Sequence, residues 1–150
     1  PSPPALLLKT NGANFSHLDR ADIKKKIERE KDKFKSADSL PNIYLLHGDL
    51  TLEQMALLYN LPKVKAMLSC THGEGFGRPL AEATCCDLPV IATGWSGQMD
   101  FLNPKQSVLI DGELKPVPKG MIWKPILVEP SKWFCADEGD IIRKLRFFSH

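Results

Sequence analysis

Short apolar runs and longer amphipathic stretches alternate along the first two-thirds of the chain. The apolar runs are typical of buried strands and comprise residues 5–9, 43–47, 64–69 and 88–93. The stretches between them predict helices over residues 19–35, 52–60 and 79–86. The first helix is expected to turn Ile23, Ile27 and Phe34 to one side. This alternation predicts an α/β fold, a parallel sheet with helices on both faces.

The last third of the chain has a less regular pattern. Residues 107–111 predict one more short strand, and the proline-rich segment 114–127 predicts an irregular excursion. A closing helix is expected over 137–148, with an apolar face made of Ile141, Ile142, Leu145 and Phe148.

Composition limits the classes of protein that the chain can represent. The 150 residues, 43% hydrophobic and 25% charged, suit one globular domain. A net charge of +2 does not indicate a nucleic-acid partner. No apolar run approaches the ~20 residues that a transmembrane helix needs. The four cysteines lack metal-site spacing, so buried, reduced thiols are expected.

One segment, His72-Gly-Glu-Gly-Phe-Gly-Arg-Pro-Leu-Ala-Glu82, carries the candidate chemistry. It joins a predicted strand to a predicted helix, at the sheet edge where such folds bind ligands. Its three glycines allow close approach of the backbone to a ligand, and Pro79 suits the first helical turn. The helix start therefore offers N–H donors for an anion, and Arg78 adds a positive charge.

Two carboxylates, Glu74 and Glu82, distinguish this segment from a plain phosphate site. Carboxylates accept hydrogen bonds from vicinal hydroxyls such as those of ribose. Donors for a diphosphate and acceptors for hydroxyls together favour a nucleotide sugar as ligand. The alternative is a structural turn in which Glu82 pairs with Arg78, four residues earlier. A dinucleotide-binding domain is less favoured, because Gly-x-Gly-x-x-Gly does not follow the first strand.

The pattern Glu74-Gly-Phe-Gly-x-Pro-x-x-Glu82, followed by Leu88-Pro-Val-Ile-Ala, resembles the Glu-x7-Glu signature of retaining glycosyltransferases (GT-B fold, group 1, family 4). The similarity extends over residues 42–103 and is looser in the flanks. It implies a Rossmann-like parallel sheet, the C-terminal half of a GT-B fold.

The resemblance also implies a role for each residue of the signature. Glu74 faces the transferred sugar and is the candidate catalytic residue, whereas Glu82 binds the ribose hydroxyls. The donor-binding set comprises Gly73, Gly75, Phe76, Gly77, Arg78, Pro79 and Glu82. Members of the family use no metal, so no cofactor is expected besides the UDP- or GDP-sugar substrate.

Three further residues are additional candidates: Lys9, at the end of the first strand, and Gly97 and Asp100, where family members often carry Gly-Gly-x-x-Glu. Arg78 replaces a usually apolar residue. It is expected to contact a phosphate or to pair with Glu82.

These residues contain no counterpart of three parts of the family's fold. The three parts are the acceptor-binding N-terminal domain, the first strand of the donor domain and the basic pair near that strand. Residues 1–150 are therefore expected to form a single nucleotide-sugar-binding domain, a fragment that does not catalyse transfer alone. The parent protein is expected to be a cytoplasmic hexosyltransferase with an unidentified acceptor; peripheral membrane association stays open. The alternatives are a non-catalytic nucleotide- or sugar-binding domain and a GT-B-like epimerase or phosphorylase.

Overall fold

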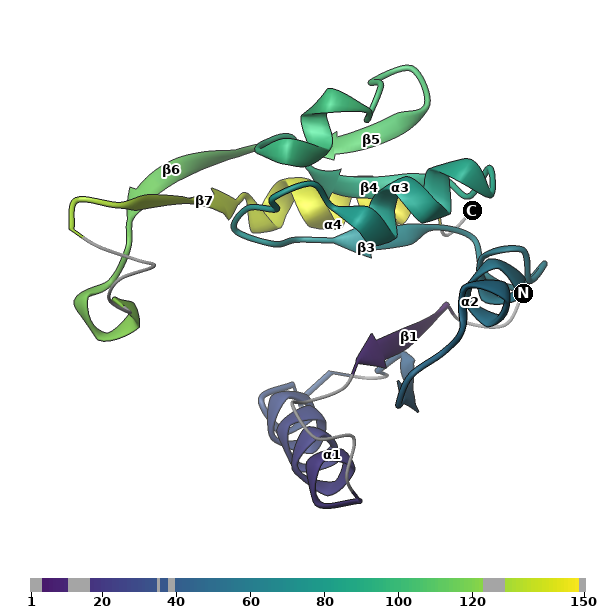
Figure 1. Ribbon diagram of the computed structural model, residues 1–150. Helices are drawn as coiled ribbons and strands as arrows, with labels where there is room; N and C mark the ends of the chain where they lie inside the picture. The colour runs from purple at the N-terminus through teal and green to yellow at the C-terminus, as the bar shows by residue number, and fades with distance from the viewer. Residues whose placement is uncertain (1–3, 11–16, 35, 38–39, 123–128, 149–150) are drawn as a thin grey trace. The chain divides into compact units, whose positions relative to one another are not determined.

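A computed structural model describes residues 4–10, 17–34, 36–37, 40–122 and 129–148 (Figure 1). The side chains of His17 and Phe148 and residues 123–128 of the predicted excursion lie outside this description. Contacts divide the chain into two compact units, Pro1–Thr51 and Leu52–His150. No helix among the described residues is long and apolar enough to cross a membrane.

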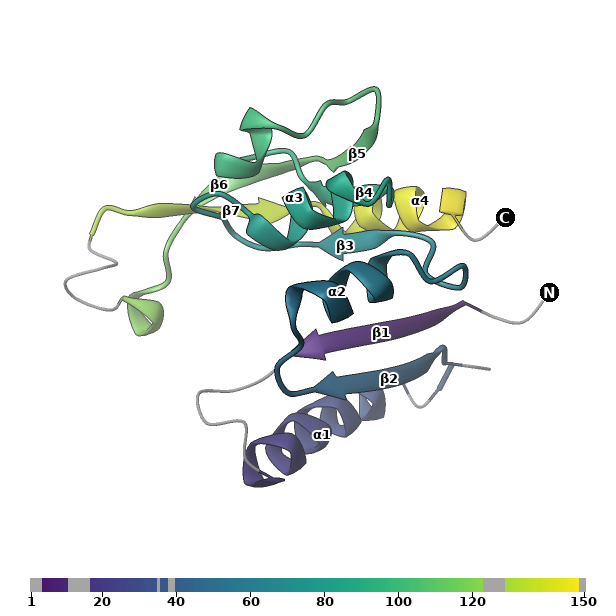
Figure 2. The same cartoon turned by 45° about the vertical axis from the view of Figure 1, so that its right-hand side comes forward.

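The N-terminal unit contains a two-stranded parallel sheet. Strands β1 (Ala5–Thr10) and β2 (Asn42–His47) pair in register, and helix α1 (His17–Asp32) lies alongside them (Figure 2). His47 on β2 approaches Asp19 on α1, with Nε2 2.7 Å from Oδ2. This contact links the helix to the end of the second strand.

The C-terminal unit contains a three-stranded parallel sheet in the order β3-β4-β5. Its strands are β3 (Met67–Ser69), β4 (Val90–Thr93) and β5 (Ser107–Ile110). The helices of this unit are α2 (Leu52–Tyr59), α3 (Arg78–Cys85) and α4 (Glu138–Phe148), with short 3-10 turns η1 (Gly97–Asp100) and η2 (Lys119–Met121). An antiparallel hairpin of β6 (Gly112–Pro116) and β7 (Lys132–Ala136) completes the unit.

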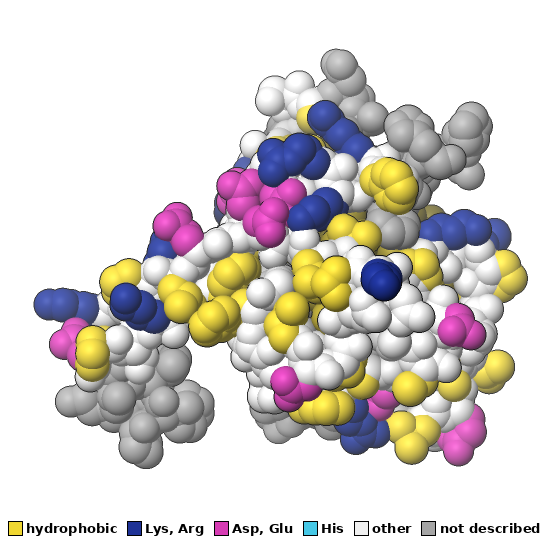
Figure 3. Space-filling model, turned by 90° about the horizontal axis from the view of Figure 1, so that it is seen from above, with side chains coloured by type: hydrophobic (Ala, Val, Ile, Leu, Met, Phe, Trp, Pro, Cys, Tyr) yellow, Lys and Arg dark blue, Asp and Glu magenta, His cyan; other side chains and the backbone are white. Residues whose placement is uncertain are grey.

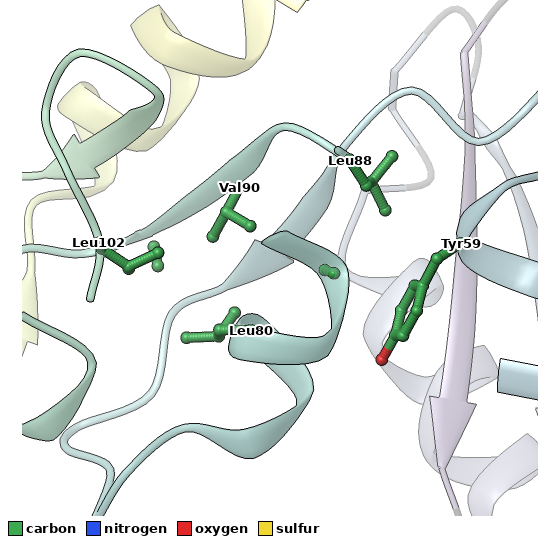
Figure 4. Packing of buried hydrophobic residues seen from close by; sticks show 7 residues of the cluster. Tyr59, Leu80, Leu88, Val90 and Leu102 are labelled. Carbon is green, nitrogen blue, oxygen red and sulfur yellow. The ribbon is translucent and has the colours of Figure 1, made fainter. Parts of the chain in front are cut away.

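The core of the C-terminal unit is formed around β4 and α3. All four residues of β4 are buried, as expected for the central strand of a sheet that is covered by helices. Leu80 on α3 and Val90 on β4 point into the space between the helix and the strand, near Leu102 (Figure 4). Each such side chain contributes about 1.5–3 kcal/mol by leaving water. This packing holds α3 against β4.

Three expectations from the sequence are corrected by the structure. The described strands form three separate sheets, not one continuous sheet, because alternation predicts parallel neighbours but does not determine which strand edges bond. Phe34 follows the end of α1 and is exposed, so it does not extend the apolar side of that helix. Cys70 and Cys85 are exposed rather than buried, and no cysteine forms a disulfide among the described residues.

Candidate functional site

The Glu74–Glu82 segment leads from the loop after β3 into α3. The helix begins where Gly77 takes a left-handed conformation with φ 82°, which is accessible to glycine without strain. The carbonyl of Gly77 then accepts the N–H groups of Leu80 at 2.9 Å and Ala81 at 3.1 Å. Pro79 lies in the first turn, where its missing N–H leaves no bond unmade. The predicted strand–loop–helix setting is confirmed.

The segment after β4 holds the backbone of Glu74. Ser96 Oγ donates to the Glu74 carbonyl at 2.7 Å and accepts the Glu74 N–H at 3.2 Å. The N–H of Gly97 donates to the same carbonyl at 3.1 Å. Earlier in the loop, Thr93 Oγ1 donates to the Thr71 carbonyl at 3.3 Å. Contacts from one neighbouring segment therefore fix the loop before the helix begins.

Gly97 lies so close to this loop that a side chain does not fit. A Cβ built at Gly97 would lie 2.0 Å from the carbonyl oxygen of Gly75, well inside van der Waals contact. A Cβ at Gly75 would meet nothing within 4 Å. The structure thus gives the sequence candidate Gly97 a packing role against the loop.

Unbonded polar groups gather at the end of the loop. Among the described residues, no acceptor is found for the backbone N–H groups of Gly75, Phe76, Gly77 and Arg78. The half-buried Glu74 carboxylate likewise makes no hydrogen bond or ion pair within the described part of the chain. The dipole of α3 adds positive potential at these N–H groups. One short loop therefore offers donors to an anion and an acceptor to a hydroxyl group.

Glu82 is paired with Arg78 on the same helix. Arg78 Nε donates to Glu82 Oε1 at 2.7 Å, and the side chains are 70% and 28% exposed respectively. An ion pair with so exposed a partner is worth only a few tenths of a kcal/mol, by an order-of-magnitude comparison with similar helix pairs. The pairing of Arg78 with Glu82, which the alternative interpretation predicted, is therefore present in the structure, but it contributes little to stability.

Tyr59 on α2 lies near Glu82, a proximity that no pattern in the sequence predicts. Burial, followed by electrostatic interaction with Glu82 and Cys86, raises the pKa of Tyr59. Its hydroxyl is buried and has no hydrogen-bond partner among the described residues. Glu82 thus bonds to a cationic partner on its own helix and interacts electrostatically with Tyr59 on the preceding helix.

The hairpin strand β7 borders the loop and was not predicted. The N–H of Phe134 donates to the His72 carbonyl at 3.0 Å, and His72 Nδ1 lies 2.7 Å from the Phe134 carbonyl. Because a carbonyl only accepts, Nδ1 of His72 carries a proton. The His72 ring stacks on Trp133 with centroids 4.0 Å apart, and Trp95 stacks on Phe134 with centroids 6.1 Å apart. The adjacent aromatic pair at 133–134, typical of strands, was the available signal.

The hairpin projects from the rest of its unit as an arm (Figure 3). Basic, acidic and hydrophobic side chains are mixed along the arm in this view. A surface of mixed sign does not resemble the basic face of a nucleic-acid-binding protein.

The remaining candidate residues are placed as follows. Phe76 is 57% exposed, and its ring centroid lies 5.1 Å from that of Phe101. Asp100 is exposed on η1. Lys9 belongs to the N-terminal unit, where its Nζ donates to the Gly48 carbonyl at 2.6 Å. Gly73 is exposed in the loop. No group of three or more His, Cys, Asp or Glu residues in the described ranges could hold a metal ion.

Comparison with known proteins gives no relative, because no protein-family model, curated protein or solved structure matches the chain. The candidate site therefore depends on the sequence pattern and on the geometry of the loop, α3 and the segment after β4.

Proposed function

We propose that the loop before α3 and the first turns of that helix bind a nucleotide-diphosphate sugar, as the donor site of a retaining glycosyltransferase. The observation that carries the proposal is the Glu74 carboxylate, which has no partner among the described residues although its own backbone is bonded on both sides. A carboxylate kept half-buried without a partner loses hydration, so a ligand hydroxyl that bonds to it restores the lost interaction.

Each part of such a ligand has a chemically matching group here. The N–H groups of Gly75 to Arg78 have no acceptor among the described residues and suit a diphosphate, because they lie at or just before a helix start, which carries positive potential. Glu74 accepts hydrogen bonds from hydroxyls of the transferred sugar. Glu82 accepts the two ribose hydroxyls, and the exposed Arg78 guanidinium neutralises phosphate charge. No metal is required in this scheme.

The proposal includes a wider architecture and context. The parallel strands and the helices that alternate with them belong to the C-terminal half of a GT-B fold. The parent protein is a cytoplasmic hexosyltransferase whose N-terminal domain binds the acceptor. These statements rest on the signature and its strand–loop–helix setting.

Isothermal titration of the chain with UDP, GDP and NAD⁺ tests the proposal. We expect saturable binding of UDP or GDP, and a loss of about tenfold or more in affinity for Glu82→Gln, because hydrogen bonds to a charged group are removed. Glu138→Gln, a change at an exposed residue in the first turn of α4, is the matched control and leaves affinity unchanged. A folded sample that binds neither nucleotide would refute the proposal, and binding of NAD⁺ alone would favour a dinucleotide-binding protein.

The role of Glu74 has a separate test. Glu74→Gln is expected to retain affinity for the nucleoside diphosphate and to lose the additional affinity for the matching nucleotide sugar. In the full-length parent, turnover should fall more than nucleotide affinity. An equal loss of both affinities would contradict the assignment of Glu74 to the sugar.

A further inference from the structure

Ser96 has a backbone conformation that is unusual for a residue with a side chain. Its φ is 79° and its ψ is −162°, a region that is populated almost entirely by glycine. Such a conformation persists only where the surrounding contacts require it. The contacts of Ser96 therefore need to account for the strain.

Both hydrogen-bonding functions of the Ser96 hydroxyl are directed at one residue. The hydroxyl proton goes to the Glu74 carbonyl at 2.7 Å, and a lone pair of the same oxygen receives the Glu74 N–H at 3.2 Å. The N–H of the next residue, Gly97, donates to the same carbonyl at 3.1 Å. All three bonds end on the backbone of Glu74.

These bonds determine where the Glu74 side chain starts. The N–H and the C=O of a residue lie in the peptide planes on either side of its Cα, so fixing both planes fixes the direction of the Cα–Cβ bond. Ser96 lies three residues after the end of β4, all of whose residues are buried, so the segment that carries it starts from a closely packed strand. The Glu74 carboxylate itself stays without a partner among the described residues.

We infer that Ser96 is a positioning residue, whose hydroxyl orients Glu74 so that the carboxylate meets the sugar of a bound nucleotide sugar. This inference rests on the proposed function. Its physical basis is preorganisation: a carboxylate that is already aimed does not have to be ordered when the ligand binds.

Two substitutions separate positioning from simple stabilisation. Ser96→Ala removes the hydroxyl and keeps the strained φ, whereas Ser96→Gly removes the hydroxyl and relieves the strain. Asp87→Gly is the matched control, because Asp87 also has a positive φ, 55°, and follows the far end of α3. Each variant is titrated with UDP and UDP-glucose and with GDP and GDP-mannose, and its stability is measured by urea denaturation.

We expect Ser96→Ala and Ser96→Gly to bind the nucleoside diphosphate as the parent chain does. Both should lose about tenfold of the extra affinity for the nucleotide sugar, as two hydrogen bonds to Glu74 disappear. Ser96→Gly should be the more stable of the two, and Asp87→Gly should keep the sugar preference. Recovery of the preference in Ser96→Gly would overturn the inference, since binding would then follow stability alone.

Hydrogen exchange at single amides distinguishes failure of this inference from failure of the proposed function. In Ser96→Ala, the Glu74 and Gly97 amides should exchange about tenfold faster than in the parent chain. Unchanged exchange would overturn the positioning role even where nucleotides bind. If the parent chain binds no nucleotide, the proposed function and the role for sugar binding both fail, while faster exchange still identifies the contact between Ser96 and Glu74.

Discussion

Gly97→Ala is the substitution whose effect the structure defines most sharply. The added Cβ would lie 2.0 Å from the Gly75 carbonyl oxygen, 2.7 Å from the carbonyl carbon and 3.0 Å from the Glu74 carbonyl oxygen. Ordinary contact at such a position begins near 3.4 Å, so the two backbone segments must separate. The atoms that the new Cβ would meet all belong to the backbone, so the clash cannot be relieved by a change of side-chain rotamer.

The magnitude follows from the contacts that separation breaks. Overpacking in a tight region costs about 1–3 kcal/mol. The three hydrogen bonds to Glu74 contribute about 1 kcal/mol each when well formed, and they weaken together as the segments move apart. We therefore expect Gly97→Ala to lower the free energy of unfolding of the C-terminal unit by about 2–4 kcal/mol.

Urea denaturation followed by tryptophan fluorescence measures this loss, because Trp95 lies next to the affected segment. Gly75→Ala is the matched control: it adds the same methyl group on the opposite side of the contact, where nothing lies within 4 Å. The control should be unchanged or more stable by up to about 1 kcal/mol. If the free energy of unfolding of Gly97→Ala were within about 0.5 kcal/mol of that of the parent chain, the close approach of the two segments would be refuted.

Two further predictions concern buried polar groups. Tyr59→Phe removes a buried hydroxyl that has no partner among the described residues. The free energy of unfolding, measured by urea denaturation, should stay unchanged or rise by up to about 1 kcal/mol. A decrease of more than about 1 kcal/mol would contradict the absence of a partner for the hydroxyl. Asp140 accepts hydrogen bonds from Lys144 Nζ at 2.6 Å and from the Asp111 N–H at 2.8 Å, and these contacts hold the pKa of its carboxyl below the ordinary 3.8. Because the pKa of Asp140 is lower in the folded state, its carboxylate stabilises the protein above about pH 3.8. This stability is lost as the pH falls through the folded-state pKa. Asp140→Asn should therefore be less stable than the parent at about pH 7, with the difference shrinking toward about pH 3 in urea denaturation. A constant difference would refute the assignment.

Local patterns along the chain identify most of the helices and strands, because burial on one side of an element leaves a period in the sequence. The prediction of strand 88–93 captures β4, and the helix predicted over 79–86 captures α3, which begins at Arg78. The hairpin β6–β7 is not predicted by the hydrophobic pattern. Its strands pair across an intervening segment, and β6 is exposed throughout, so hydrophobic alternation does not mark it.

The candidate site likewise has one part that the sequence predicts and one part that only the structure shows. Glu74, Glu82 and the glycines belong to one contiguous motif, which is visible in the sequence. The supports of that motif come from distant positions: Ser96 is 22 residues from Glu74, and Phe134 is 62 residues from His72. Such contacts depend on which strand ends lie together, and a strained φ at Ser96 has no signature in residue type. The packing role of Gly97 likewise becomes apparent only once Gly75 is seen against it.

The pair between Arg78 and Glu82 shows how magnitudes decide between two interpretations of one contact. A structural turn and a ribose site both call for a carboxylate at position 82, and the 2.7 Å contact fits the first. The ion pair is exposed on the Arg78 side and contributes only a few tenths of a kcal/mol, by comparison with similar helix pairs. Hydrogen bonds from two ribose hydroxyls to the same charged group are worth about 1.5–3 kcal/mol each. A bound nucleotide can therefore displace Arg78 from Glu82 at little cost and leave the guanidinium free to approach the diphosphate. The contact that supports a structural interpretation of the motif is thus compatible with the proposed binding of a nucleotide sugar.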